Sequence, residues 1–371
     1  MVDLQSQYKR LKTEIDKAIE DVLKTANFIK GHQVSDFENN LAHFIKSKYC
    51  ISCGNGTDAL QIALMALNLK PGDEVIIPAF TYIATVEVAA LLNLKIILVD
   101  VDENNFNLSV NSLGNLEIST KTKAIMPVHL YGQCAPMQTI MELAKSNNLY
   151  VVEDNAQAIG AEYIFNDNYR CFAGTIGDIG CTSFFPSKNL GAFGDGGAIF
   201  TQSKSLAEKI SLIANHGQKI KYQHDTIGIN SRLDTIQAAI LNVKLNYLNE
   251  FNKKRQYVAE IYDRELNNYV IIPKKESYST HVYHQYTIRL ENKHTRDKLK
   301  NHLSNLGIPS VIYYPIPVHL QPGYSYLGYK KGDFKNAEKL SETVLSLPIH
   351  TEMNETQLSF IIEGIKSFFR N

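Results

Sequence analysis

The 371-residue sequence has no excess of either charge, because 38 Lys and Arg residues balance 38 Asp and Glu residues. A protein without a net field has no general means of collecting nucleic acid or an anionic membrane surface. Any recognition of phosphate must therefore be local. No apolar run approaches the roughly 20 residues that a membrane-crossing helix needs. These absences favour a globular protein that acts on small molecules.

Cysteine is scarce and odd in number, with five residues. This count argues against a disulfide framework, and the polar, mixed-charge residues 1–12 do not resemble a secretory signal. We therefore expect a cytoplasmic protein. Cys50 and Cys53 form a C-x-x-C motif, which admits a redox dithiol. It does not predict a zinc site, because no second pair of ligands follows at a zinc-like spacing. The simpler interpretation is two small buried residues in a strand.

Two phosphate-binding fingerprints are also missing, the P-loop and the G-x-G-x-x-G motif of nicotinamide-binding folds. The chain instead alternates between strand-like and helix-like apolar patterns. The expected strands are 49–53, 74–78, 95–100, 123–128, 149–153, 181–185 and 197–201, and the expected helices are 4–23, 57–67, 81–92, 137–146 and 206–215. This alternation predicts a mostly parallel sheet covered on both faces, with ligands bound beyond the carboxyl ends of its strands.

The rest of the chain resembles a smaller α/β unit. Residues 234–264 predict one long helix or two joined helices, and a polar stretch at 273–280 marks a change in composition. The elements expected beyond it are strands at 283–290 and 310–314 and helices at 295–305, 333–345 and 356–369. We therefore place a large α/β domain at 1–245 and a smaller C-terminal α/β domain at 246–371.

The segment that follows strand 49–53 contains Gly54, Gly56 and Thr57 before a predicted helix. Glycine lets a backbone come close to a ligand, and free N–H groups at a helix N-terminus attract phosphate. The alternative is an ordinary helix start capped by Thr57 or Asp58. Taken alone, this segment does not decide between the two.

Two carboxylates, Glu153 and Asp154, come at the end of strand 149–153. Buried carboxylates are costly unless they are partnered, and side chains alternate along a strand. One of the two can therefore face a ligand while the other points away. The functional interpretation is a carboxylate that pairs with a cationic ring nitrogen or a metal. The alternative is a helix N-cap by Asp154.

Lys188 lies in an apolar, glycine-rich loop between two predicted strands, close to Phe184 and Phe185. Loss of hydration lowers the pKa of such an amine and makes it available as a nucleophile. The alternative is a lysine that extends to the surface. Arg232 precedes the long helix, and its planar fork suits phosphate or carboxylate; the alternative is a salt bridge to Asp234.

A phosphate cradle, a carboxylate for a ring nitrogen and a desolvated lysine are what a pyridoxal-phosphate (PLP) enzyme needs. At this point the chain resembles, over nearly its whole length, the DegT/DnrJ/EryC1/StrS family of sugar aminotransferases. The segments that carry the resemblance are GNGTDAL, PGDEVIIPAFTYIAT, PVHLYGQ, VVEDNAQAIGA, TSFFPSKNLG, GDGGAI, NSRLDTIQAAIL and YYPIPVHLQP. The implied fold is PLP-dependent transferase fold type I, aspartate-aminotransferase-like. It has a large, mostly parallel seven-stranded sheet domain and a smaller C-terminal α/β domain.

The resemblance also implies roles for individual residues. Lys188 would be the catalytic residue, covalently bonded to pyridoxal 5'-phosphate and moving protons, and Asp154 would pair with the pyridinium nitrogen. The implied cofactor-binding residues are Gly56, Thr57, Tyr82, Asp154, Gln157, Ser183, Lys188 and Asn230, and the implied substrate-binding residues are Arg232, Tyr314 and His319. Asn230 would come from the neighbouring subunit of a homodimer with shared active sites. No metal is implied.

The implied reaction moves an amino group from glutamate to a nucleotide-linked keto-sugar and leaves 2-oxoglutarate, with no nucleic-acid or membrane partner. The segments CISCGNGTDALQIALMAL, PVHLYGQCAPM and NSRLDTIQAAIL resemble members that aminate C3 of UDP-2-acetamido-2-deoxy-3-keto-hexuluronate for the O-antigen of lipopolysaccharide. The alternative is C3 or C4 amination of a dTDP- or GDP-keto-6-deoxyhexose. Tyr313 stands where many relatives have His, which leaves its role toward the substrate open.

Two other classes compete with an aminotransferase. Dehydratases that resemble this family carry histidine in place of the cofactor lysine, whereas Lys188 is present here. A regulator built on the same fold would lose Lys188 or Asp154, or would carry a DNA-binding domain, and the sequence shows neither departure. An oxidoreductase built on Cys50 and Cys53 is a further alternative.

Overall fold

The computed structural model describes residues 1–370 and is built on a seven-stranded sheet with the order β1-β9-β8-β5-β4-β2-β3. The strands are β1 (Tyr49–Cys53), β2 (Glu74–Pro78), β3 (Lys95–Val99), β4 (Thr122–Ile125), β5 (Tyr150–Asp154), β8 (Ile179–Ser183) and β9 (Gly197–Thr201). Neighbouring strands are parallel except at β9, which is antiparallel to both β1 and β8. The predicted seven-stranded, mostly parallel sheet is confirmed.

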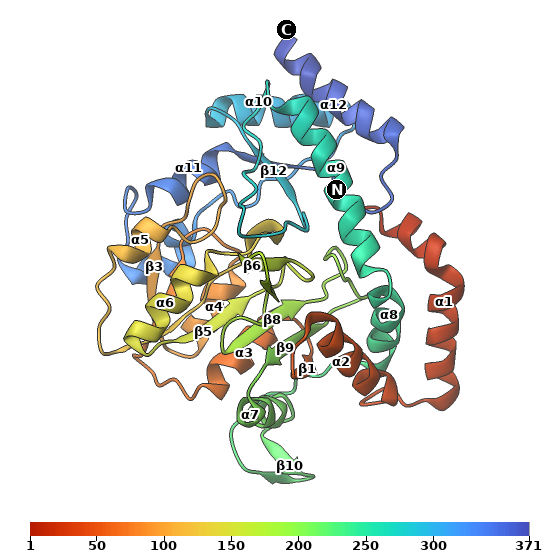
Figure 1. Cartoon of the computed structure of the whole chain (residues 1–371), viewed down its shortest axis with the longest axis vertical. Helices are drawn as coiled ribbons and strands as arrows, with labels where there is room; N and C mark the ends of the chain where they lie inside the picture. Colours follow the sequence, from red (N-terminus) through yellow and green to blue (C-terminus); the bar gives the residue numbers. More distant parts are fainter. Residues whose placement is uncertain (371) are drawn as a thin grey trace.

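Helices cover both faces of this sheet (Figure 1). They are α1 (Leu4–Thr25), α2 (His32–Ile45), α3 (Gly56–Ala66), α4 (Ala84–Leu91), α5 (Val110–Gly114), α6 (Met137–Asn147), α7 (Lys204–Ala214) and α8 (Thr235–Leu245). Alternate residues of β2 show why the strands are apolar throughout. Val75 and Ile77 join the core beside α3 and α4, and Ile76 joins the core beside α6 on the other face. A strand buried on both faces has no polar side to alternate with.

The C-terminal part has a core of its own. Its elements are α9 (Leu248–Leu266), β12 (Tyr286–Arg289), α10 (Lys293–Asn305), α11 (Lys335–Thr343), β13 (Val344–Leu347) and α12 (Glu355–Arg370). Residues from α9, α10, α12 and the antiparallel β12–β13 pair form one apolar cluster. Val318 and Leu340, however, pack into the core of the large sheet. The division between residues 245 and 246 therefore stays a prediction.

Residues 234–264 form two helices, α8 and α9, which is the second of the two predicted arrangements. Other elements differ from the sequence-based expectations. The predicted strand at 310–314 is wrong, because that stretch contributes a single bridge between Val311 and Ser346. The predicted helix at 333–345 is too long, because it ends at Thr343 and the buried apolar residues after it form β13. Helix α2 and the short helix α5 were not predicted.

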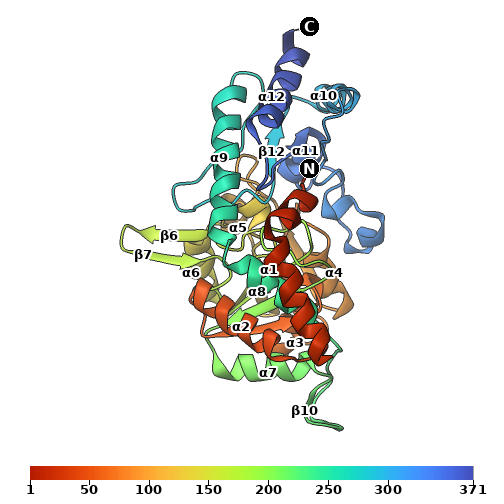
Figure 2. The ribbon, with the colours of Figure 1, turned by 90° about the vertical axis from the view of Figure 1, so that its right-hand side faces the viewer.

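Two hairpins were also not predicted, β6 (Glu162–Asn166) with β7 (Tyr169–Phe172) and β10 (Gln218–Ile220) with β11 (Gln223–His224). The β10–β11 hairpin projects from one end of the molecule, beyond α7 (Figures 1 and 2). It exposes Ile220 and Tyr222, and Ile227 beside it is 84% exposed. These apolar side chains are therefore mostly open to solvent in the described residues 1–370.

None of the helices in residues 1–370 is both long and apolar enough to cross a membrane.

Candidate active site

The predicted site residues lie where parallel strands end. The carboxyl ends of β1, β2, β5 and β8 share one edge of the sheet, since these strands run in the same direction. The chain leaves these ends at Gly54, Ala79, Asn155 and Phe184. This is the edge at which open α/β sheets bind ligands.

The first part of the site is the start of α3. Asn55 caps this helix, and its Oδ1 accepts a hydrogen bond from the Asp58 amide at 2.8 Å. A cap by Thr57 or Asp58 is therefore wrong. A Cβ on Gly56 would lie 2.7 Å from the Cβ of Ser183, so glycine allows α3 to approach the end of β8. The free N–H groups of this first turn and the Ser183 hydroxyl can together serve one anion.

The segment that contains Asn230 is tied to this cradle in the same chain. The Ser231 Oγ accepts a hydrogen bond from the Gly54 amide at 2.8 Å and donates one to Asp58 Oδ2 at 2.6 Å. The Asn230 side chain itself is exposed. It is therefore free to contact something other than its own cradle.

Asp154 ends β5 and keeps part of its carboxylate available. Its Oδ2 accepts a hydrogen bond from Thr85 Oγ1 at 2.7 Å, and its Oδ1 accepts one from the Ala156 amide at 3.1 Å. The side chain is 5% exposed. No helix begins at Asp154, and β5 is followed by the β6–β7 hairpin. The N-cap alternative is therefore wrong.

The neighbouring Glu153 points away from the site and is fully buried. Its two oxygens accept hydrogen bonds from His129 Nε2 and from the amides of Gly174, Ile176 and Gly177. The expected division between one carboxylate facing the ligand side and one facing away agrees with this arrangement.

Lys188 lies in the loop between β8 and β9 and is half-buried. Phe184 beside it is buried, whereas Phe185 is 52% exposed. Loss of hydration lowers the pKa of Lys188 to about 8, and the Asp154 carboxylate acts in the opposite direction. At a pKa of about 8, roughly a tenth of the amine is unprotonated at pH 7, far more than for an ordinary lysine, and this is the form that a nucleophile requires.

Aromatic and amide groups border the same region. Gln157 accepts a hydrogen bond from the Tyr131 amide at 2.7 Å and donates one to the Tyr314 hydroxyl at 3.0 Å. The rings of Tyr82 and Tyr314 lie 6.1 Å apart between centroids. Sequence reasoning missed Thr85 and Tyr131. The one feature of the sequence that could have pointed to Thr85 is its position in the predicted helix that follows β2.

Two predicted substrate residues lie elsewhere. His319 is buried, and its Nε2 lies 3.0 Å from Glu338 Oε1. This contact ties His319 to α11 in the ligand-free chain, and its role toward the substrate stays a prediction. Arg232 lines a hollow of about 270 Å³ with Lys30 and Glu38, and this hollow does not include Lys188. Among residues 1–370, Arg232 makes no ion pair with Asp234.

The C-x-x-C motif carries no redox site. Cys50 and Cys53 are buried and form no disulfide. Burial raises the pKa of both thiols, which disfavours the thiolate that redox exchange needs. The interpretation as two small buried residues in a strand is confirmed.

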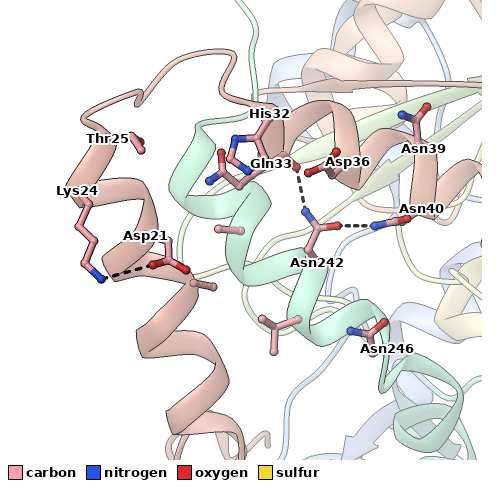
Figure 3. Close-up of a pocket in the computed structure, with 13 residues that line it drawn as sticks. Asp21, Lys24, Thr25, His32, Gln33, Asp36, Asn39, Asn40, Asn242 and Asn246 are labelled. Carbon is pink, nitrogen blue, oxygen red and sulfur yellow. Dashed lines mark hydrogen bonds and ion pairs between the residues drawn. The ribbon is translucent and has the colours of Figure 1, made fainter.

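A separate polar groove runs between α1, α2 and α8, with a volume of about 910 Å³ (Figure 3). Asn242 spans its floor and donates to the Gln33 carbonyl at 2.9 Å, while its Oδ1 accepts from Asn40 at 3.0 Å. None of the predicted site residues lines this groove. It is therefore distinct from the site at the sheet edge.

The residues at the sheet edge fit PLP. The close approach of Gly56 to Ser183 leaves an anion cradle at a helix N-terminus, Asp154 offers a carboxylate, and Lys188 offers a desolvated amine. With the sheet order above, this arrangement fits a PLP-dependent enzyme of fold type I.

Comparison with known proteins makes the assignment more specific. The model of the DegT/DnrJ/EryC1/StrS aminotransferase family matches residues 9–366, and the chain belongs to this family. It is 44% identical, over 98% of both chains, to the UDP-2-acetamido-2-deoxy-3-oxo-D-glucuronate aminotransferase of Pseudomonas aeruginosa. It is also 44% identical, over 100% of this chain and 98% of the other, to a protein of Geobacillus stearothermophilus named pleiotropic regulatory protein.

Solved structures agree. The crystal structure of DesV from S. venezuelae has a TM-score of 0.95 and 36% identity, covering 100% of this chain and 98% of that one. NtdA of Bacillus subtilis, solved with bound PMP, has a TM-score of 0.87 and 32% identity, covering 97% and 82%. The chain is accordingly a PLP-dependent sugar aminotransferase.

Proposed function

We propose that this enzyme transfers the amino group of glutamate to C3 of UDP-2-acetamido-2-deoxy-3-keto-hexuluronate, in the synthesis of O-antigen or another surface polysaccharide. The observation that carries the proposal is the similarity, over nearly the full length of both chains, to the Pseudomonas aeruginosa enzyme named for that substrate. The site at the sheet edge supports the same kind of chemistry.

Bound PLP supplies a carbonyl that condenses with amines and a ring that accepts electrons. In the proposed arrangement, the amides of Gly56 and Thr57 and the hydroxyl of Ser183 receive its phosphate. Asp154 keeps a proton on the ring nitrogen, and its orientation is fixed by Thr85. Tyr82 covers a face of the ring, and Gln157 lies beside it.

Lys188 is the proposed catalytic residue. It would hold the cofactor through Nζ and would move a proton at the carbon that gains or loses the amino group. Its lowered pKa supports this role, because an amine that is always protonated can neither attack nor accept a proton.

Tyr314 is the proposed contact for the sugar, since its hydroxyl is held by Gln157 beside Asp154. Arg232 is the proposed contact for the sugar carboxylate or the diphosphate. Because Arg232 lies in a hollow apart from Lys188 and Asn230 is exposed, we assign both to the site of a second copy of the chain. The exposed Ile220 and Tyr222 of the β10–β11 hairpin, with Ile227 beside it, support such an association.

The visible absorption spectrum of the purified protein with PLP tests this proposal first. We expect the long-wavelength band of a lysine-linked cofactor, which glutamate converts to the short-wavelength band of its aminated form. The UDP-linked 3-keto-hexuluronate should then restore the first band. Lys188→Ala is the control and should show no lysine-linked band.

Other results would contradict particular parts of the proposal. If the protein forms no band with PLP, the role proposed for Lys188 is wrong. If a dTDP- or GDP-keto-6-deoxyhexose restores the first band and the hexuluronate does not, the proposed substrate is wrong. If another amino acid converts the band and glutamate does not, the proposed donor is wrong.

A further inference from the structure

A second lysine lies directly behind the loop that carries Lys188. Lys244 of α8 is 1% exposed, although lysine is rarely buried unless it is paired with an acid. Its Nζ donates a hydrogen bond to the Gly191 carbonyl at 2.5 Å and lies 5.4 Å from the centroid of the Phe193 ring. The buried ammonium is therefore directed at the backbone of the loop.

Helix α8 holds this backbone at two points. Gln237 Oε1 accepts a hydrogen bond from the Phe193 amide at 2.8 Å, and Lys244 donates to the Gly191 carbonyl. The two side chains are about two helical turns apart, so they lie on the same face of α8. One helix face thus offers an acceptor to a loop N–H and a donor to a loop carbonyl.

The loop between these contacts is tightly folded. A Cβ on Gly191 would lie 2.3 Å from the Pro186 carbonyl oxygen, so the chain turns back on itself around Lys188. The Ala192 amide donates to the Phe184 carbonyl at 2.8 Å, and Asn189 Nδ2 donates to Asn252 Oδ1 at 2.7 Å. A change in the position of Gly191 would therefore move the turn that contains Lys188.

Lys244 is a costly means of filling this space. A methionine of similar length would avoid the desolvation of a charge. What methionine lacks is a donor for the Gly191 carbonyl, and hydrogen bonds from charged donors are strong and directional. Loss of hydration, with a smaller effect of Arg255, lowers the pKa of Lys244 to about 8, which is the physical sign of this cost.

We propose that Lys244 is a positioning residue for Lys188, because its hydrogen bond to Gly191 fixes the turn that aims the Lys188 amine at the cofactor. The inference rests on the role of Lys188 proposed above. Lys244 does not touch the reacting atoms, and it acts through the backbone of residues 186–191.

Hydrogen exchange in the apoprotein tests the structural half of this proposal. In Lys244→Met we expect peptides that cover residues 184–193 to exchange on the order of tenfold faster than in the wild type. The urea midpoint should not fall, because a desolvated charge has been removed. Lys209→Met, at an exposed lysine of α7, is the matched control and should change neither.

A role in packing alone predicts a different pattern. Methionine fills a similar volume, so exchange in residues 184–193 of Lys244→Met would then stay as in the wild type, and this result would overturn the proposal. Because these measurements need no cofactor, they do not depend on whether the proposed substrate is correct.

Measurements on the holoenzyme test the functional half of this proposal. In Lys244→Met we expect the pH midpoint of the cofactor absorption band to shift. The kcat with glutamate should fall about tenfold to a hundredfold, the range expected for a misplaced catalytic group, with KM within about twofold. Lys244→Arg, which keeps a charged donor, should restore both. An unshifted midpoint with wild-type kcat would overturn the inference, whereas a wild-type protein without the band would instead contradict the role of Lys188.

Discussion

Glu153 and Asp154 are adjacent residues with different environments, because neighbouring side chains of a strand point to opposite faces. Glu153 is surrounded by four donors, one from His129 and three from backbone amides. Asp154 is less completely bonded, and its charge raises the pKa of Lys188 against the effect of burial. Of the two carboxylates, Asp154 is therefore the one with capacity for a ligand.

This effect of Asp154 on Lys188 can be measured directly. In Asp154→Asn the ammonium of Lys188 loses a stabilising negative charge while its burial is unchanged. We expect the pKa of Lys188 to fall below its wild-type value of about 8. The pH dependence of Lys188 acetylation in the apoprotein, followed by mass spectrometry of its peptide, gives this value.

Asp195→Asn is the matched control for this experiment. Asp195 is in the same loop but exposed, and water and salt screen an exposed charge. The acetylation profile of Lys188 should therefore stay as in the wild type. A midpoint that rises in Asp154→Asn would mean that the carboxylate does not act on this amine.

Gly56, Asp154 and Lys188 could be chosen from the sequence, because they lie at or beyond the ends of strands of a predicted parallel sheet. Ser183 came from the family resemblance alone. Thr85 could not be chosen from the strand pattern, since its bond to Asp154 depends on how α4 lies beside β5. The burial of His319 could not be predicted either, because it depends on contacts with Glu338 and Phe334.

At the scale of elements, Glu153 joins three segments at the end of β5. His129 Nδ1 accepts a hydrogen bond from the Ala135 amide at 3.0 Å, so its Nε2 carries the proton that is donated to Glu153. The amides of Gly174, Ile176 and Gly177 donate to the same carboxylate. The 129–135 segment in turn places the Tyr131 amide on Gln157. A buried side chain outside the site thus supports one inside it.

Replacing this carboxylate should destabilise the fold markedly. In Glu153→Gln an NH2 group would meet backbone N–H donors, which leaves buried groups without partners. We expect a loss of about 2–4 kcal/mol in the free energy of unfolding, measured by urea denaturation of the apoprotein. Glu117→Gln, at an exposed glutamate before β4, should change it by less than about 0.5 kcal/mol. A similarly small change at Glu153 would show that the four bonds contribute little.

The strands of the large sheet were predictable because burial on both faces gives short, continuous apolar runs. The strand β13 in the C-terminal part was harder to predict, since its apolar residues follow directly on those of helix α11. Residues 344–347 continue the apolar pattern of α11, and their pairing with β12 makes them a strand. The β10–β11 hairpin has few apolar residues and no partner in its own chain, so its sequence carries little local signal.

At the scale of the whole molecule, the exposed groups suggest a site completed by a second copy. Asn230 is exposed although the adjacent Ser231 is bonded to the phosphate cradle. The projecting hairpin exposes Tyr222, and Ile227 lies exposed between it and Asn230. Apolar side chains that are exposed on a single subunit are normally covered by the partner protein when they belong to an interaction surface. We expect a two-fold homodimer in which each subunit contributes to both sites.

Mixing inactive subunits separates a shared site from two independent ones. Lys188→Ala lacks the proposed cofactor lysine, and Asn230→Ala lacks the contact proposed for the neighbouring site, so we expect each homodimer to be inactive once free PLP is removed. After the two variants are mixed and their subunits exchange at random, about half of the dimers are mixed, and each mixed dimer has one intact site. Activity should then return to about a quarter of the wild type, measured as turnover of glutamate.

Lys188→Ala mixed with the double variant is the control and should stay inactive, because no combination restores both residues to one site. If the first mixture also stays inactive after proven subunit exchange, Lys188 and Asn230 serve the same site from one chain, and the active site is not shared.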